Sequence, residues 1–156
     1  MDRSNTRPQG VELFAIACQR HGLSLTNPDR IRGYNEIRYI AAPNFPTSKL
    51  PLRIPLRIVT GSEAPLTVYA RDEFTKALAI AYVWHVHQRP RFFLLSYSEA
   101  LGVLGEQRVC MPAWESYGYW HITNLDPERQ RQMAPFEDRW EWLRNRLDEY
   151  GGRVSY

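Results

Sequence analysis

Two histidines separated by one residue, His85 and His87, are the first candidates for chemistry in this chain. On a β-strand, residues i and i+2 face the same way about 6.6 Å apart along the strand, so the two imidazoles could share a metal ion. Zinc needs four ligands, or three ligands and a water molecule. The other possible ligands form no spaced pair: His21, His121, Cys18 and Cys110. Either these histidines bind a metal, or they are an ordinary strand residue and a surface turn residue.

A second candidate is the charged segment that contains Asp72, Glu73 and Lys76, between two strand-like runs. An aspartate at a strand end with a lysine nearby could hold a divalent cation and position a water molecule for attack on a phosphodiester. The alternative is a charged hairpin tip whose side chains keep the turn solvated.

A resemblance to a known family rests on "RPQGVELFAIACQRHGLSL" (7–25), where Gly10 is followed by Glu12, an amphipathic helix and a second glycine. This segment resembles the opening of many PD-(D/E)XK nucleases. The resemblance implies that Glu12 and Asp72 bind Mg²⁺ and that Lys76 polarises the phosphate or the attacking water. It therefore implies a Mg²⁺-dependent phosphodiesterase of the DNA endonuclease type.

The chain departs from that family in the strand that should carry an acidic-x-Lys pair, because residues 77–86 contain no acid and no lysine. Lys76 precedes the strand instead of lying within it. Three alternatives follow: a rearranged site, a site on an earlier strand where Glu36 and Arg38 have acid-x-base spacing, or a fold kept without catalysis.

The basic residues favour a nucleic-acid partner, DNA or RNA. Of the 20 basic residues only Lys49 and Lys76 are lysine, and the net charge is +3. The planar guanidinium of arginine suits phosphate and base edges better than an ammonium group. We expect Arg71, Arg89 and Arg91 to hold the backbone. A GC-rich genome would also favour arginine codons.

An aromatic segment supports a different function. "AWESYGYW" (113–120) contains four large aromatic side chains: Trp114, Tyr117, Tyr119 and Trp120. Such residues are enriched at interface hot spots. In this alternative the protein is not an enzyme but an accessory subunit, or an immunity- or antitoxin-like protein, that binds a protein partner or its own copy through this loop. The same aromatics could instead plug the end of a sheet.

The elements that would position these residues follow from periodicity. Residues 9–22 predict a helix that Gly22 ends. Strand-like runs follow at 34–42, 52–61, 66–73, 77–86 and 91–97, with Pro55 indicating an edge strand. Ser96 and Glu99 form a capping box for a short helix, residues 107–126 read as irregular, and Pro135 begins a final helix to about residue 150.

This order predicts an α+β fold: an N-terminal helix, a mostly antiparallel four- to five-stranded meander, and C-terminal helices. The 156 residues suit one domain, 1–156, with 1–8 flexible. From the printed residues we expect neither a membrane-spanning segment nor a secretory signal. Two cysteines are too few for a disulfide framework, so we expect a cytoplasmic protein. No Gly-rich phosphate loop, Gly-x-Ser-x-Gly elbow or zinc-finger spacing occurs.

Overall fold

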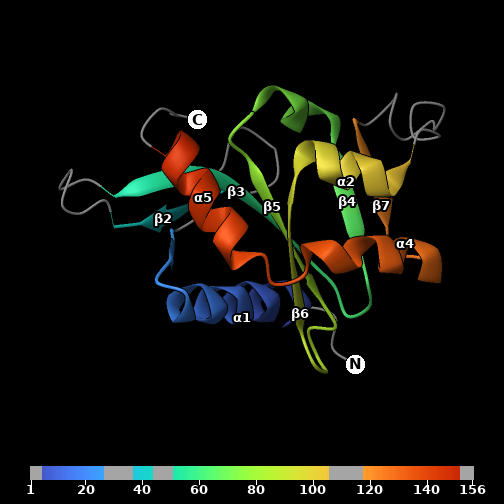
Figure 1. Ribbon diagram of the computed structural model, residues 1–156. Coiled ribbons are helices and arrows are strands. Elements are labelled where there is room, and N and C mark those ends of the chain that lie inside the picture. Colours follow the sequence, from blue (N-terminus) through green and yellow to red (C-terminus); the bar gives the residue numbers. More distant parts are fainter. Residues whose placement is uncertain (1–4, 27–36, 44–50, 106–117, 152–156) are drawn as a thin grey trace.

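The architecture is a central β-sheet with helices packed on both of its faces (Figure 1). The computed structural model describes residues 5–26, 37–43, 51–105 and 118–151. Within these ranges no helix has the length and apolarity needed to cross a membrane. The predicted α+β class is confirmed, with an N-terminal helix, a mostly antiparallel sheet and C-terminal helices.

Five strands form the central sheet, in the order β1-β2-β3-β5-β6. Their bounds are Ser24–Leu25 for β1, Arg38–Ala42 for β2, Leu52–Thr60 for β3, Ala79–Trp84 for β5 and Arg91–Ser96 for β6. Neighbouring strands are antiparallel except β3 and β5, which run parallel. A parallel pair needs a crossover connection. Residues 61–78 form this crossover. The strand predicted at 66–73 lies within the crossover and is not part of the central sheet.

Strand β5 lies between β3 and β6, and all six of its residues are buried. One face of the strand presents Ala79, Ala81 and Val83, and the other presents Ile80, Tyr82 and Trp84. A strand covered on both faces gives a continuous apolar run. The strand predicted within 77–86 is therefore confirmed, and it lies in the interior of the sheet.

The face with the small residues packs against α1 (Thr6–Arg20) and α5 (Trp140–Tyr150). Phe14 of α1 stacks on Trp140 of α5 with ring centroids 5.7 Å apart. The fully buried Cys18 belongs to this core, and burial raises the pKa of its thiol to about 12, so it stays an unreactive thiol.

The opposite face packs against α2 (Tyr97–Leu104), α4 (Pro127–Met133) and a separate two-stranded ribbon. The ribbon consists of β4 (Leu66–Tyr69) and β7 (Tyr119–Ile122), which are antiparallel. Two 3-10 helices, η2 (Ala70–Phe74) and η4 (Ala134–Phe136), complete this layer. The predicted capping box at the start of α2 is present, since Ser96 and Glu99 each accept a hydrogen bond from the other's backbone N–H.

Strand β3 is not the edge strand that Pro55 indicates, because it lies between β2 and β5. Pro55 pairs with Tyr39 of β2, whereas pairing with β5 begins only at Leu56. A proline is tolerated there because no β5 residue stands opposite it.

Three other segments differ from expectation. Residues 6–8, predicted to be flexible, form the first turn of α1, where the N–H that Pro8 lacks would have no helical partner. Residues 119–122, expected to be irregular, form β7. Pro135 lies in η4, so the last helix, α5, begins at Trp140.

Candidate functional site

The predicted metal ligand Asp72 lies in a buried ion pair. Its side chain belongs to η2 and is 1% exposed. Arg57 of β3 donates from Nε to Oδ2 and from Nη2 to Oδ1 of Asp72, each over 2.7 Å. Arg57 is 3% exposed as well. The pair therefore ties the crossover to the central sheet.

The other two predicted catalytic residues do not join Asp72. Glu12 is exposed on α1, which packs on the sheet face that holds Leu56 and Ile58 of β3. Arg57, between those two residues, points to the opposite face, as strand geometry requires. The sheet therefore separates Glu12 from Asp72. Lys76 is exposed beyond η2, and its carbonyl accepts a hydrogen bond from Arg146.

This arrangement does not fit the predicted Mg²⁺ site. Mg²⁺ demands near-ideal octahedral oxygen coordination. Both carboxylate oxygens of Asp72 are engaged by a buried guanidinium, and Glu12 lies across the sheet. In the described ranges, no group of three His, Cys, Asp or Glu side chains could hold a metal ion. Glu36 and Cys110 lie outside those ranges.

The His85 and His87 pair takes part in local structure. His85 follows β5 with a φ of 55°, and its N–H donates to the Glu63 carbonyl over 3.0 Å. His87 Nε2 lies 2.8 Å from Thr6 Oγ1. His87 thus connects the turn between β5 and β6 to the first residue of α1.

The three arginines predicted to hold nucleic acid have different surroundings. Arg91 donates two hydrogen bonds to Glu137, over 2.8 and 2.9 Å, and this pairing raises the pKa of Arg91. Arg71 is half-buried in η2, and Arg89 is exposed in the turn after β5. Arg89 is therefore the most accessible of the three.

The aromatic segment is described only in part, since Trp114 and Tyr117 lie outside the described residues. Tyr119 is 37% exposed at the start of β7. Trp120 is half-buried and packs against the core beneath α2.

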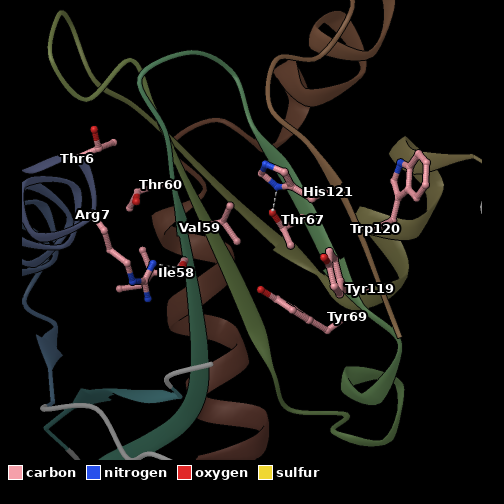
Figure 2. Close-up of a pocket in the computed structure, with 10 residues that line it drawn as sticks. All are labelled: Thr6, Arg7, Ile58, Val59, Thr60, Thr67, Tyr69, Tyr119, Trp120 and His121. Atoms are coloured by element: carbon pink, nitrogen blue, oxygen red, sulfur yellow. Dashed lines mark hydrogen bonds between the residues drawn. The ribbon is translucent and has the colours of Figure 1, made fainter. Parts of the chain in front are cut away.

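A cleft of about 840 Å³ lies between the first turn of α1, strand β3 and the β4–β7 ribbon (Figure 2). This volume is in the range of about 300–1,000 Å³ that small-molecule sites occupy. It is lined by Thr6, Arg7, Ile58, Val59, Thr60, Thr67, Tyr69, Tyr119, Trp120 and His121.

Side chains of the β4–β7 ribbon alternate between the cleft and the hydrophobic core. Thr67 stands opposite His121 and Tyr69 opposite Tyr119, and these four residues share the cleft side. The alternate residues Leu66, Val68 and Ile122 belong to the core beneath α2. In Figure 2 the Trp120 ring points away from the other side chains that line the cleft.

Burial determines the protonation states of His121 and Tyr69 on the ribbon, and a hydrogen-bond contact positions His121. His121 Nδ1 lies 2.6 Å from Thr67 Oγ1. Desolvation lowers the pKa of His121, so the imidazole is neutral at pH 7. Burial raises the pKa of Tyr69, against the opposing effect of the Arg57 and Arg7 charges, so its phenol stays protonated and can donate.

Among the described residues that line the cleft, Arg7 is the cation, and none is a carboxylate. Its side chain is exposed in the first turn of α1, and Nη1 donates to the Ile58 carbonyl over 2.9 Å. The first turn of α1 has no acidic residue. The partial positive charge of a helix N-terminus therefore adds to Arg7 at this border of the cleft.

Sequence reasoning missed Arg7, Thr67 and Tyr69. It considered His121 only as a further metal ligand and Tyr119 only as an aromatic residue for a protein partner. Alternation in 66–69 and in 119–122 was the available signal. It does not say that the two segments pair, because Thr67 and His121 are 54 positions apart.

Comparison of the chain with protein-family models, with curated proteins and with solved structures finds no match. The functional argument therefore rests on the geometry of the cleft.

Proposed function

We propose that the protein binds nucleic acid in the cleft between α1, β3 and the β4–β7 ribbon. The observation that supports this most is the lining, whose described residues combine a guanidinium, phenols, hydroxyls and an imidazole with no carboxylate. Phosphate oxygens accept hydrogen bonds from these groups, and arginine pairs with them most strongly. A carboxylate in the lining would repel the phosphate.

The charge of the whole chain supports the same ligand class. The 20 basic residues outnumber the 17 acidic ones. The acid closest in sequence to the cleft lining on β4, Asp72, is neutralised by Arg57 in the interior. A polyanion approaching the cleft therefore meets Arg7 and the N-terminus of α1, and the described residues of the lining include no carboxylate.

The proposal is binding and does not include metal-dependent cleavage. Cleavage would need Glu12 and Asp72 on one metal ion, and the sheet lies between them. The resemblance of the opening helix to PD-(D/E)XK nucleases stays a prediction.

The proposal is tested by titrating the protein into a fluorescein-labelled oligonucleotide at several salt concentrations and following the anisotropy. Arg7→Gln is compared with Arg20→Gln, which removes the same charge from an exposed site in the last turn of the same helix. The two sites are about 20 Å apart along the helix. We expect affinity to fall with salt, and Arg7→Gln to weaken binding and reduce the salt slope by about one unit.

Arg20→Gln should change the affinity much less. A flat salt response would contradict binding through phosphates, and equal losses in the two variants would contradict the cleft as the site. Thermal melts of both variants show whether the fold is intact.

A further inference from the structure

Two tyrosines form an aromatic surface on the cleft side of the ribbon. Tyr69 and Tyr119 are directly opposite each other in the β4–β7 pairing. Their ring centroids are 6.0 Å apart with an interplanar angle of 45°. Both side chains line the cleft, and Figure 2 shows them side by side at its lower end.

The buried guanidinium of Arg57 packs against the Tyr69 ring. The Arg57 guanidinium lies 4.3 Å from the centroid of the Tyr69 ring. Its two hydrogen bonds to Asp72 fix its position, and Nη1 has no hydrogen-bond partner in the described structure. A cation on one face of a ring restricts the ring and draws electron density from it. Tyr69 is thus preorganised for contact with an electron-rich aromatic group.

The phosphate-binding group is on another wall of the cleft. Arg7 comes from α1 and is held at β3 by the Ile58 carbonyl. In Figure 2 the Tyr69 hydroxyl points from β4 toward the β3 side of the cleft. The cleft therefore offers an aromatic wall and a cationic wall to one ligand.

From this arrangement we infer that the cleft takes single-stranded nucleic acid, with one unpaired base against the Tyr69–Tyr119 pair and an adjacent phosphate at Arg7. The inference rests on the proposed nucleic-acid binding and narrows it. Base faces in a duplex are covered by their neighbours, whereas an unpaired base can be splayed out and stacked on aromatic side chains. A duplex would meet only the cationic wall.

The test compares a labelled single strand with the duplex formed by annealing its complement. Tyr119→Ala should raise the single-strand Kd about five-fold or more, because stacking on an aromatic side chain is lost. The duplex Kd should stay unchanged. Tyr119→Phe keeps the ring and should restore the affinity that Tyr119→Ala loses. If the alanine variant does not fold, Tyr119→Leu keeps apolar bulk in β7 without a ring.

The control variant is Phe74→Ala, which removes an aromatic side chain that is 85% exposed on η2 and does not line the cleft. It should leave both affinities unchanged. Equal effects of Tyr119→Ala on single strand and duplex, or no effect on either, would overturn the stacking inference. If Arg7→Gln still weakened binding in that case, nucleic-acid binding in the cleft would stand. Absence of salt-dependent binding to either form would overturn both.

Discussion

At the scale of single residues, Arg57 contacts two residues whose roles depend on it, Asp72 and Tyr69. It pairs with Asp72 through both carboxylate oxygens and lies against the Tyr69 ring. A carboxylate that looked like a metal ligand in the sequence is therefore part of the interior. The available signal was a basic residue inside the apolar run of β3, because buried charges are almost always paired.

Loss of one partner of this pair should destabilise the fold. Asp72→Ala leaves the Arg57 charge buried without its partner, and we expect the free energy of unfolding to fall by about 3–5 kcal/mol. The double variant Arg57→Met/Asp72→Leu removes both charges and should recover much of the loss. Urea unfolding of the single and double variants measures both effects.

Glu137→Ala is the matched comparison, since it breaks a pair with Arg91 that also has two hydrogen bonds but is 39% and 30% exposed. Solvent screening should hold its cost to about 1 kcal/mol or less. Similar losses for Asp72→Ala and Glu137→Ala would contradict the account of Asp72 as a buried structural residue.

His121 gives a pH dependence of stability. Because burial lowers the pKa of His121 in the folded protein, the unfolded chain binds a proton more readily as the pH falls through its ordinary value of 6.5. Stability is therefore complete above that pH and is lost as the pH falls through the lowered folded pKa. Wild type should lose more stability than His121→Gln between about pH 7.5 and 5. Parallel pH profiles in urea unfolding would contradict this.

At the scale of elements, Gly10 sets the distance between α1 and the sheet. A Cβ at Gly10 would lie 2.6 Å from Thr60 Cγ2, whereas a Cβ at Gly102 of α2 would meet nothing within 4 Å. Gly10→Ala should lower the free energy of unfolding by about 1–3 kcal/mol through overpacking. Gly102→Ala should raise it by up to about 1 kcal/mol, as alanine does in an open helix.

Urea unfolding of the two alanine variants shows whether each substitution raises or lowers the free energy of unfolding. A stabilised Gly10→Ala variant would show that α1 does not approach β3 so closely. The glycine that contributed to the nuclease resemblance thus has a packing role in this chain.

Elements with local signals could be predicted from the sequence, and elements that depend on distant pairing could not. The continuous apolar run of β5, the Ser96–Glu99 capping box and the glycine after α1 are local, and each is present. The ribbon is not local, because β4 and β7 pair across some 50 residues, 54 between Thr67 and His121. The cleft depends on that pairing, so the sequence did not predict that these residues line one site.

At the scale of the whole molecule, the sheet divides the predicted sites into two layers. Glu12 belongs to the layer of α1 and α5, and the Arg57–Asp72 pair belongs to the layer of α2, α4 and the ribbon (Figure 1). The cleft forms where the first turn of α1, residues 58–60 of β3 and the ribbon border one space. Arg7 in the first turn of α1 and the two tyrosines of the β4–β7 ribbon thereby line the same cleft.

The most direct test of nucleic-acid binding in this cleft is a map of amide NMR shifts on titration with a single-stranded oligonucleotide in the presence of EDTA. We predict the largest changes at residues 6–7, 58–60, 67–69 and 119–121, which contribute the cleft lining. Changes confined to the turn around Arg89 or to the surface around Glu12, or a titration that requires Mg²⁺, would contradict the account.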